Sequence, residues 1–97
     1  MKIQRPMAKL DINALLAQVR EQTRARQCLA ATLAAQNHPV RMTSIRHCAL
    51  KALVGQDMSE PGRFRITRFD DRGPYSHSVF NCFETAIYDA LAEGFEP

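Results

Sequence analysis

The sequence lacks the features that would place it in a membrane or a secretory pathway. It has no tryptophan, only 7% aromatic residues and no long apolar run. Its longest near-apolar run is residues 28–35, CLAATLAA, whereas a membrane-spanning helix needs about 20 apolar residues. The opening MKIQRPMAKLD holds no apolar stretch of secretory length, so we expect no signal peptide. These absences favour a cytoplasmic protein with no membrane partner.

Catalytic and metal-binding motifs are also absent. There is no phosphate-binding loop, no G-x-S-x-G and no tight C-x-x-C or H-x-x-x-H pair. His77 precedes Cys82 by five positions, and His47 and Cys48 are helical neighbours that point about 100° apart. We therefore expect no metal site, no cofactor and no enzymatic activity. A Cys/His enzyme is therefore less favoured than a protein that binds another protein or one that binds nucleic acid.

The three cysteines give the same indication about compartment. Cys28, Cys48 and Cys82 are odd in number and widely spaced, which is typical of reduced thiols in a cytosolic protein. The length of 97 residues, with 45% hydrophobic and 24% charged residues, predicts one domain spanning residues 1–97. We expect residues 1–9 to be flexible.

Charge is distributed unevenly along the chain, whose net charge is +3. Residues 1–55 carry nine lysines and arginines against two carboxylates, and residues 56–97 carry four arginines against eight carboxylates. A basic half favours an anionic partner, either nucleic acid or an acidic protein surface.

The first expected element is helical. Asp11 is a good N-cap, and apolar residues follow it at helical spacing from Ile12 to Val19. Residues 20–27 are polar, and Asn37-His38-Pro39 ends the pattern. One long helix or two helices with a bend at residues 20–27 both fit.

A second helix is expected soon after the first. Residues 40–42 are short and extended, as in an edge strand, and Thr43 or Ser44 is suited to cap the helix that follows. Gly55 is the expected stop. The apolar positions of this helix are Ile45, Cys48, Ala49, Ala52 and Leu53.

The last part of the chain predicts a hairpin and a helix. Residues 63–69 and 75–80 read as two strands joined by a turn, in which Asp70 or Asp71 bonds the turn amides. Asn81 and Glu84 stand in capping-box relation at the start of an amphipathic helix, which Gly94 ends.

The predicted fold is therefore α+β. It consists of two N-terminal helices, the first long, then a β-hairpin with a third short strand from residues 40–42 or the Ile3 region, and a C-terminal amphipathic helix. The predicted core is Leu15, Leu16, Val19, Leu29, Leu33, Ile45, Ala49, Leu53, Ile66, Val79, Phe83, Ile87 and Leu91.

Two stretches resemble known kinds of protein. Residues 29–53, LAATLAAQNHPVRMTSIRHCALKAL, look like the opening helices and short strand of a winged helix, and the arginine-bearing hairpin then resembles its wing. The segment VGQDMSEPGRF is too short for a recognition helix, so this likeness implies a degenerate winged helix that binds nucleic acid, such as a small repressor.

The ending RFDDRGPYSHSVFNCFETAIYDALAEGF, residues 68–95, resembles the tail of small phage and plasmid accessory proteins. These include anti-CRISPR-type inhibitors of bacterial defence systems. The likeness implies a protein that binds a large host complex, carries no catalytic motif and acts by occlusion.

The favoured hypothesis is thus a small non-enzymatic binding protein of a mobile genetic element. It would occlude a protein or ribonucleoprotein complex whose surface is acidic or bears nucleic acid. Direct nucleic-acid binding is the alternative, and a homodimer through residues 20–27 is a further option. The predicted partner-binding residues are Arg20, Arg24, Arg26, Arg41, Arg46, Lys51, Asp70, Asp71, Arg72 and Tyr75.

Overall fold

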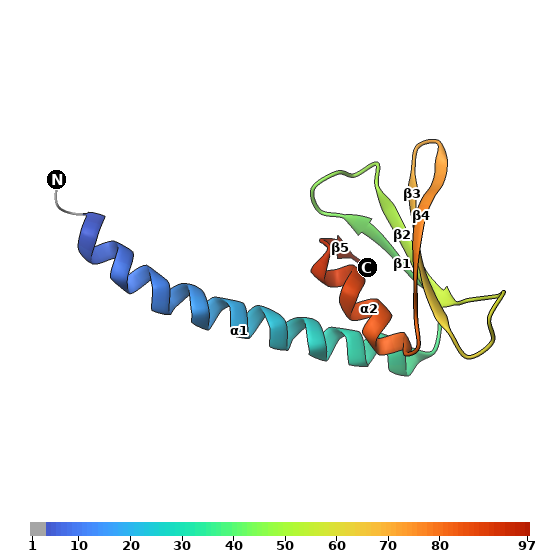
Figure 1. The fold of residues 1–97 in the computed structure, drawn as a ribbon, viewed down its shortest axis with the longest axis horizontal. Coiled ribbons are helices and arrows are strands. Elements are labelled where there is room, and N and C mark those ends of the chain that lie inside the picture. Colours follow the sequence, from blue (N-terminus) through green and yellow to red (C-terminus); the bar gives the residue numbers. More distant parts are fainter. Residues whose placement is uncertain (1–3) are drawn as a thin grey trace.

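One long helix, α1 (Gln4–Gln36), forms the first third of the chain (Figure 1). The computed structural model describes the backbone of residues 4–97 and the side chains of residues 11–97. The expectation of a flexible end at residues 1–9 therefore falls partly outside the described residues. Of the two options for this segment, the single helix is correct. No glycine or proline interrupts residues 11–36, and alanine, arginine and glutamine, which are frequent there, are good helix formers.

The helix ends at Asn37, as the sequence predicts. Asn37 has a φ of 57°, in the left-handed region that asparagine tolerates, and its N–H donates to the Ala34 carbonyl at 3.1 Å. Pro39 follows two residues later and turns the chain into the sheet.

Five antiparallel strands form one sheet in the order β4-β3-β2-β1-β5. Strands β1 (Val40–Ser44), β2 (Lys51–Gln56), β3 (Phe64–Asp70) and β4 (Gly73–Phe80) follow one another as a meander. Helix α2 (Phe83–Ala92) then crosses the sheet, and β5 (Phe95–Glu96) pairs with β1. The α+β class is correct, but the prediction of one hairpin with a third short strand is wrong.

The predicted second helix does not form. Residues 45–50 are a loop, and residues 51–56 are β2. The Ser44 hydroxyl accepts hydrogen bonds from the N–H groups of Arg46 and His47, at 3.1 and 3.2 Å, as a capping residue would. Here the bonds close a turn instead, because the alternation of β2 buries Ala52 and Val54 beside β1. Without this helix the winged-helix arrangement is lost.

The hairpin of β3 and β4 is confirmed with a shorter connection than expected. The turn is Asp71-Arg72, and the Asp70 carboxylate accepts the Arg72 N–H at 2.8 Å. A bulge lies between Arg68 and Phe69, where the sequence alternation slips. The Asp70 side chain thus has a structural role in this turn.

Helix α2 matches its amphipathic pattern but not its predicted cap. Cys82, not Asn81, is the N-cap residue, and it makes no side-chain capping bond. Gly94 ends the helix as predicted, with a φ of 104° and its N–H bonded to the Leu91 carbonyl at 3.0 Å.

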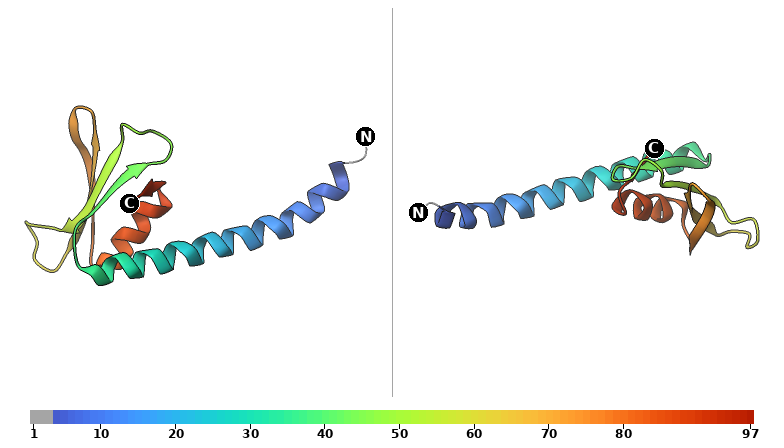
Figure 2. Two further views of the ribbon diagram at one scale, coloured as in Figure 1. Left: turned by 180° about the vertical axis from the view of Figure 1, so that it is seen from behind. Right: turned by 90° about the horizontal axis from the view of Figure 1, so that it is seen from above.

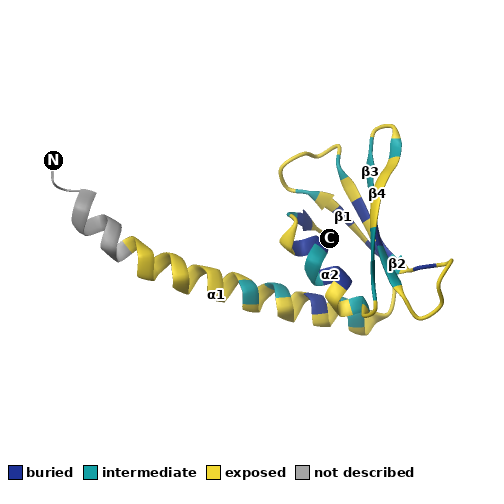
Figure 3. Ribbon diagram, viewed as in Figure 1, coloured by how far each residue is buried: buried dark blue, intermediate teal, exposed yellow. Residues whose placement is uncertain are grey.

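The core lies between α2 and one face of the sheet (Figure 3). Val54, Ile66 and Ile87 are its largest fully buried side chains. Among residues 11–36 of α1, only Ala30 is fully buried, with Leu33 and Ala34 packed beside it. The core prediction is correct for Ile66, Ile87 and Leu91, and Leu33, Val79 and Phe83 are half-buried. It is wrong for these exposed residues: Leu15, Leu16, Val19, Leu29, Ile45, Ala49 and Leu53.

The N-terminal half of α1 extends away from the rest of the molecule (Figure 2). The radius of gyration is 17.1 Å, whereas a compact chain of this length would have about 13 Å. No helix of the described residues is both long and apolar enough to cross a bilayer.

Candidate binding surface on the open face of the sheet

Helix α2 covers one face of the sheet, with α1 packed on α2, and the other face is open (Figures 1 and 2). Strand alternation decides which side chains this open face carries. In β1, Val40 and Met42 are buried toward α2, so Arg41 and Thr43 point the opposite way and are exposed. The open face consists of Arg41, Thr43, Lys51, Leu53, Gly55, Arg65, Thr67, Phe69, His77 and Val79.

Strand register arranges these residues in rows. Arg41, Leu53, Thr67 and His77 lie level across β1, β2, β3 and β4. Paired residues on neighbouring strands lie about 5 Å apart, so the row spans roughly 15 Å. Lys51 lies in the next row. Arg41 is therefore the direct neighbour of Leu53, Lys51 lies one row away, and His77 stands at the far end of the row beyond Thr67. Leu53 itself is 37% exposed.

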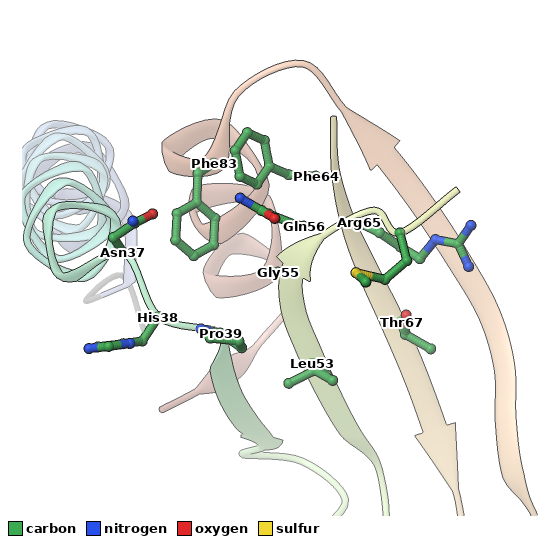
Figure 4. Close-up of a pocket in the computed structure, with 11 residues that line it drawn as sticks. Asn37, His38, Pro39, Leu53, Gly55, Gln56, Phe64, Arg65, Thr67 and Phe83 are labelled. Atoms are coloured by element: carbon green, nitrogen blue, oxygen red, sulfur yellow. The ribbon is translucent and has the colours of Figure 1, made fainter. Parts of the chain in front are cut away.

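A hollow of about 350 Å³ opens at one end of this face (Figure 4). Its floor includes Gly55, where a Cβ atom would lie 3.4 Å from Pro39 Cβ. Leu53, Met58 and Arg65 also line it, and Met58 is 91% exposed. The hollow is therefore largely apolar with a cation at its rim.

Arg65 is held at this rim by a buried carboxylate. Its Nη2 lies 3.3 Å from Asp57 Oδ1, and the Asp57 side chain is only 2% exposed. The hydroxyl and N–H of Ser59 donate to the same oxygen at 2.8 and 3.0 Å. These two bonds, and then the charge of Arg65, hold the pKa of Asp57 below its usual range. Asp57 stays ionised, so it offsets much of the charge of Arg65.

An aromatic pair lines the far wall of the hollow. The rings of Phe64 and Phe83 stack with centroids 5.1 Å apart and an interplanar angle of 14°. One face of each ring is therefore covered by the other ring, and both side chains are half-buried.

The structure separates the predicted basic residues into three groups. Arg20 and Arg24 lie on the part of α1 that extends from the domain, and Arg26 and Arg46 line a second hollow, of about 400 Å³, near the end of α2. Arg41 and Lys51 lie together on the open face.

The predicted turn residues lie elsewhere. Asp70, Asp71 and Arg72 stand at the β3–β4 turn, away from the hollow, and Tyr75 is 49% exposed on β4. The sequence interpretation did not select Arg65 or His77 as site residues. The alternation of residues 64–69 was a signal for Arg65, because it separates Arg65 and Thr67 from buried Ile66. Leu53 was missed because it was assigned to a helix.

No group of three or more histidine, cysteine, aspartate or glutamate side chains suited to a metal ion occurs among the described residues.

The thiol of Cys82, at the start of α2, has a shifted pKa. The N–H and hydroxyl of Thr85 approach its sulfur and lower the pKa of the thiol, although neither contact has the geometry of a full capping hydrogen bond.

Comparison of the chain with protein-family models, curated proteins and solved structures found no match.

Proposed function

We propose that this is a non-enzymatic, cytoplasmic binding protein whose open sheet face docks on an acidic, partly apolar surface of another protein. The observation that carries the proposal is the set Arg41, Lys51 and Leu53 beside the hollow at Gly55. Basic side chains around an exposed apolar centre are suited to a surface that offers carboxylates around an apolar anchor. The three described cysteines are free thiols, which supports a reducing compartment.

A protein partner is favoured over nucleic acid by the charges of the open face and by the state of the two rings that line the hollow beside it. The charge of Arg65 is largely offset by Asp57, so Arg41 and Lys51 are the main cations that the open face could present to phosphate. Single-stranded nucleic acid needs flat rings for its bases, and the rings nearest the hollow, Phe64 and Phe83, already stack on each other.

The mode of action that we propose is occlusion of a macromolecular complex. The likeness of residues 68–95 to phage and plasmid accessory proteins supports bacterial defence complexes as the first partners to test. The origin in a mobile genetic element rests on the same likeness.

The test compares two variants with the same change in net charge in a quantitative pull-down from bacterial lysate. We expect Arg41→Glu with Lys51→Glu to weaken retention of the captured partner at least tenfold. Arg20→Glu with Arg24→Glu, on the extended part of α1, should retain it. Loss of the partner with the second variant alone would move the site to α1 and contradict the proposal.

A separate titration addresses nucleic acid. The protein is titrated with a labelled random-sequence duplex and a single strand at low and physiological salt. We expect no tight binding even at low salt. Tight binding that collapses as salt rises would indicate phosphate contacts and would overturn the choice of a protein partner.

A further inference from the structure

Helix α1 carries an apolar seam that continues past the part covered by α2. The seam residues alternate in steps of four and three, the heptad spacing of a helix that packs along its length on another helix. They are Ile12, Leu16, Val19, Thr23, Arg26, Ala30 and Leu33, of which all but Thr23 and Arg26 are apolar. Leu15 lies on the edge of the seam beside Leu16.

The C-terminal part of the seam is already occupied within the chain. Ala30 is fully buried, and Leu33 packs against the core beneath α2. Helix α2 ends near Arg26, since Arg26 and the last turn of α2 line one hollow. Thr23 and Arg26 are half-buried at this boundary.

The N-terminal part of the seam has no cover among the described residues. Ile12, Leu15, Leu16 and Val19, named here the free seam, are 60%, 56%, 51% and 56% exposed. Figure 3 shows this stretch of α1 as exposed all round. Four large apolar side chains on adjacent turns form a contiguous patch of the kind that marks an interaction site.

We propose that a second copy of this chain covers the free seam, with the two α1 helices packed antiparallel about a two-fold axis. The seam is one continuous surface that already packs on a helix, α2, in its C-terminal half. The same spacing in the N-terminal half therefore fits a helix too, and a second α1 presents a seam of matching period and length. Symmetric pairing of one patch with itself is the commonest form of association between soluble chains.

The position of α2 selects the antiparallel orientation. In a parallel pair both domains would lie at the same end, and the partner helix would run into α2 from Thr23 onward. In an antiparallel pair the partner's domain lies beyond the opposite end of the free seam. The partner helix then runs in the same direction as α2 and meets it end to end, with the first turn of the partner, residues 4–7, level with residues 24–27, where α2 stops.

The residue pattern also sets the register. With the two-fold axis between Leu15 and Leu16, Ile12 lies level with Val19 of the second copy. All four apolar residues of each copy then face those of the other. The two Arg20 side chains are kept about 14 Å apart along the helix axis, because nine residues at 1.5 Å separate their levels.

The first test measures the mass of the full-length chain by sedimentation equilibrium up to about 0.1 mM, the range in which moderate self-association is detected. We expect a species of twice the 11.0 kDa chain mass. Leu16→Glu with Val19→Glu should weaken dimerisation at least tenfold. Ala14→Glu with Ala17→Glu adds the same charge to the opposite side of α1 and should leave the dimer intact. A monomeric wild-type chain, or a dimer that the seam variant does not weaken, would overturn the proposal.

A cross-linking experiment then tests the orientation. Cys28, Cys48 and Cys82 are replaced by serine, and Ile12→Cys or Val19→Cys is added to give two proteins. In the antiparallel pair a short bifunctional maleimide should join one protein to the other, and neither to itself, because Ile12 lies level with Val19. Linkage of each protein to its own kind would show a parallel pair and contradict the proposed geometry.

This proposal is independent of the open face. Arg41→Glu with Lys51→Glu should leave the dimer unchanged, because neither residue lies on α1. Failure of one proposal is thereby distinguished from failure of the other.

Discussion

Arg68 on β3 binds Glu93, the C-cap residue of α2, through two parallel hydrogen bonds. Arg68 Nε donates to Glu93 Oε1 at 2.8 Å, and Nη2 donates to Oε2. Arg68 Nη1 also donates to Ser78 at 3.1 Å and Ser76 at 3.3 Å, both on β4. This pair joins the last turn of α2 to the sheet, and the Arg68 side chain is only 14% exposed.

Replacing Glu93 should therefore destabilise the fold. We expect Glu93→Gln to lower the free energy of unfolding by about 2 kcal/mol, because a half-buried guanidinium loses a charged acceptor. The matched control is Glu60→Gln, which removes the exposed 3.8 Å pair with Arg63 and should cost about 0.5 kcal/mol or less. Urea denaturation of both variants measures the difference. Equal losses in the two would contradict the role of the Arg68–Glu93 pair.

Asp89 should give stability an unusual pH dependence. Partial burial of the Asp89 carboxyl, and then its hydrogen bond and charge interaction with Glu93, raise the pKa of Asp89. A raised carboxyl pKa means that the folded state holds the proton more tightly than the unfolded state. The stability that it contributes is present at acid pH and is lost as pH rises through the raised pKa.

Asp89→Asn should accordingly raise the urea midpoint at pH 7, where the wild-type carboxylate is charged. The gain should disappear near pH 3, where the wild-type carboxyl is protonated in both states. Glu93 acts in the opposite direction, because its hydrogen bonds with Arg68 lower its pKa and its contribution is lost as pH falls. Midpoints at the two pH values measure the Asp89 effect, and an equal loss of stability at both would contradict it.

Cys82 should react as a partly activated thiol. Its pKa is lowered at the start of α2 by the N–H and the hydroxyl of Thr85, so more of it is thiolate at neutral pH. We expect Thr85→Val to slow alkylation of Cys82 by iodoacetamide about two- to fivefold at pH 7. Peptide-level mass spectrometry follows the rate, and Cys28, which is exposed in the C-terminal third of α1, serves as the internal control. An unchanged Cys82 rate would show that the Thr85 hydroxyl does not act on the thiol.

Two residues that the helical spacing predicts to lie in the core, Ile87 and Leu16, should differ in how much their replacement by alanine lowers stability. Ile87 is fully buried, and Leu16 is 51% exposed. We expect Ile87→Ala to cost about 3 kcal/mol and Leu16→Ala about 0.5 kcal/mol or less, because only the first leaves a cavity. Denaturation at a dilution where the chain is monomeric removes any effect of dimerisation. A large loss for Leu16→Ala under those conditions would place Leu16 in the core of the monomer.

Where local signals agree with one another, the sequence predicts the structure. Asn37 with Pro39 ends α1, Gly94 ends α2, and Asp70 closes the turn of the β3–β4 hairpin, because each signal acts through bonds or backbone preferences within a few residues. The amphipathic pattern of α2 was also sufficient to place Ile87 in the core.

The conformation of residues 43–56 and the exposure of the free seam were decided only by tertiary structure. Ala52 and Val54 suit a helix or a strand, and the strand wins because β1 and β3 lie on either side to pair with it and α2 covers its buried face. Leu16 and Val19 have a pattern typical of a core, but the domain is too short along α1 to reach them. A helical pattern determines which side chains share a face, whereas only packing determines whether anything covers that face.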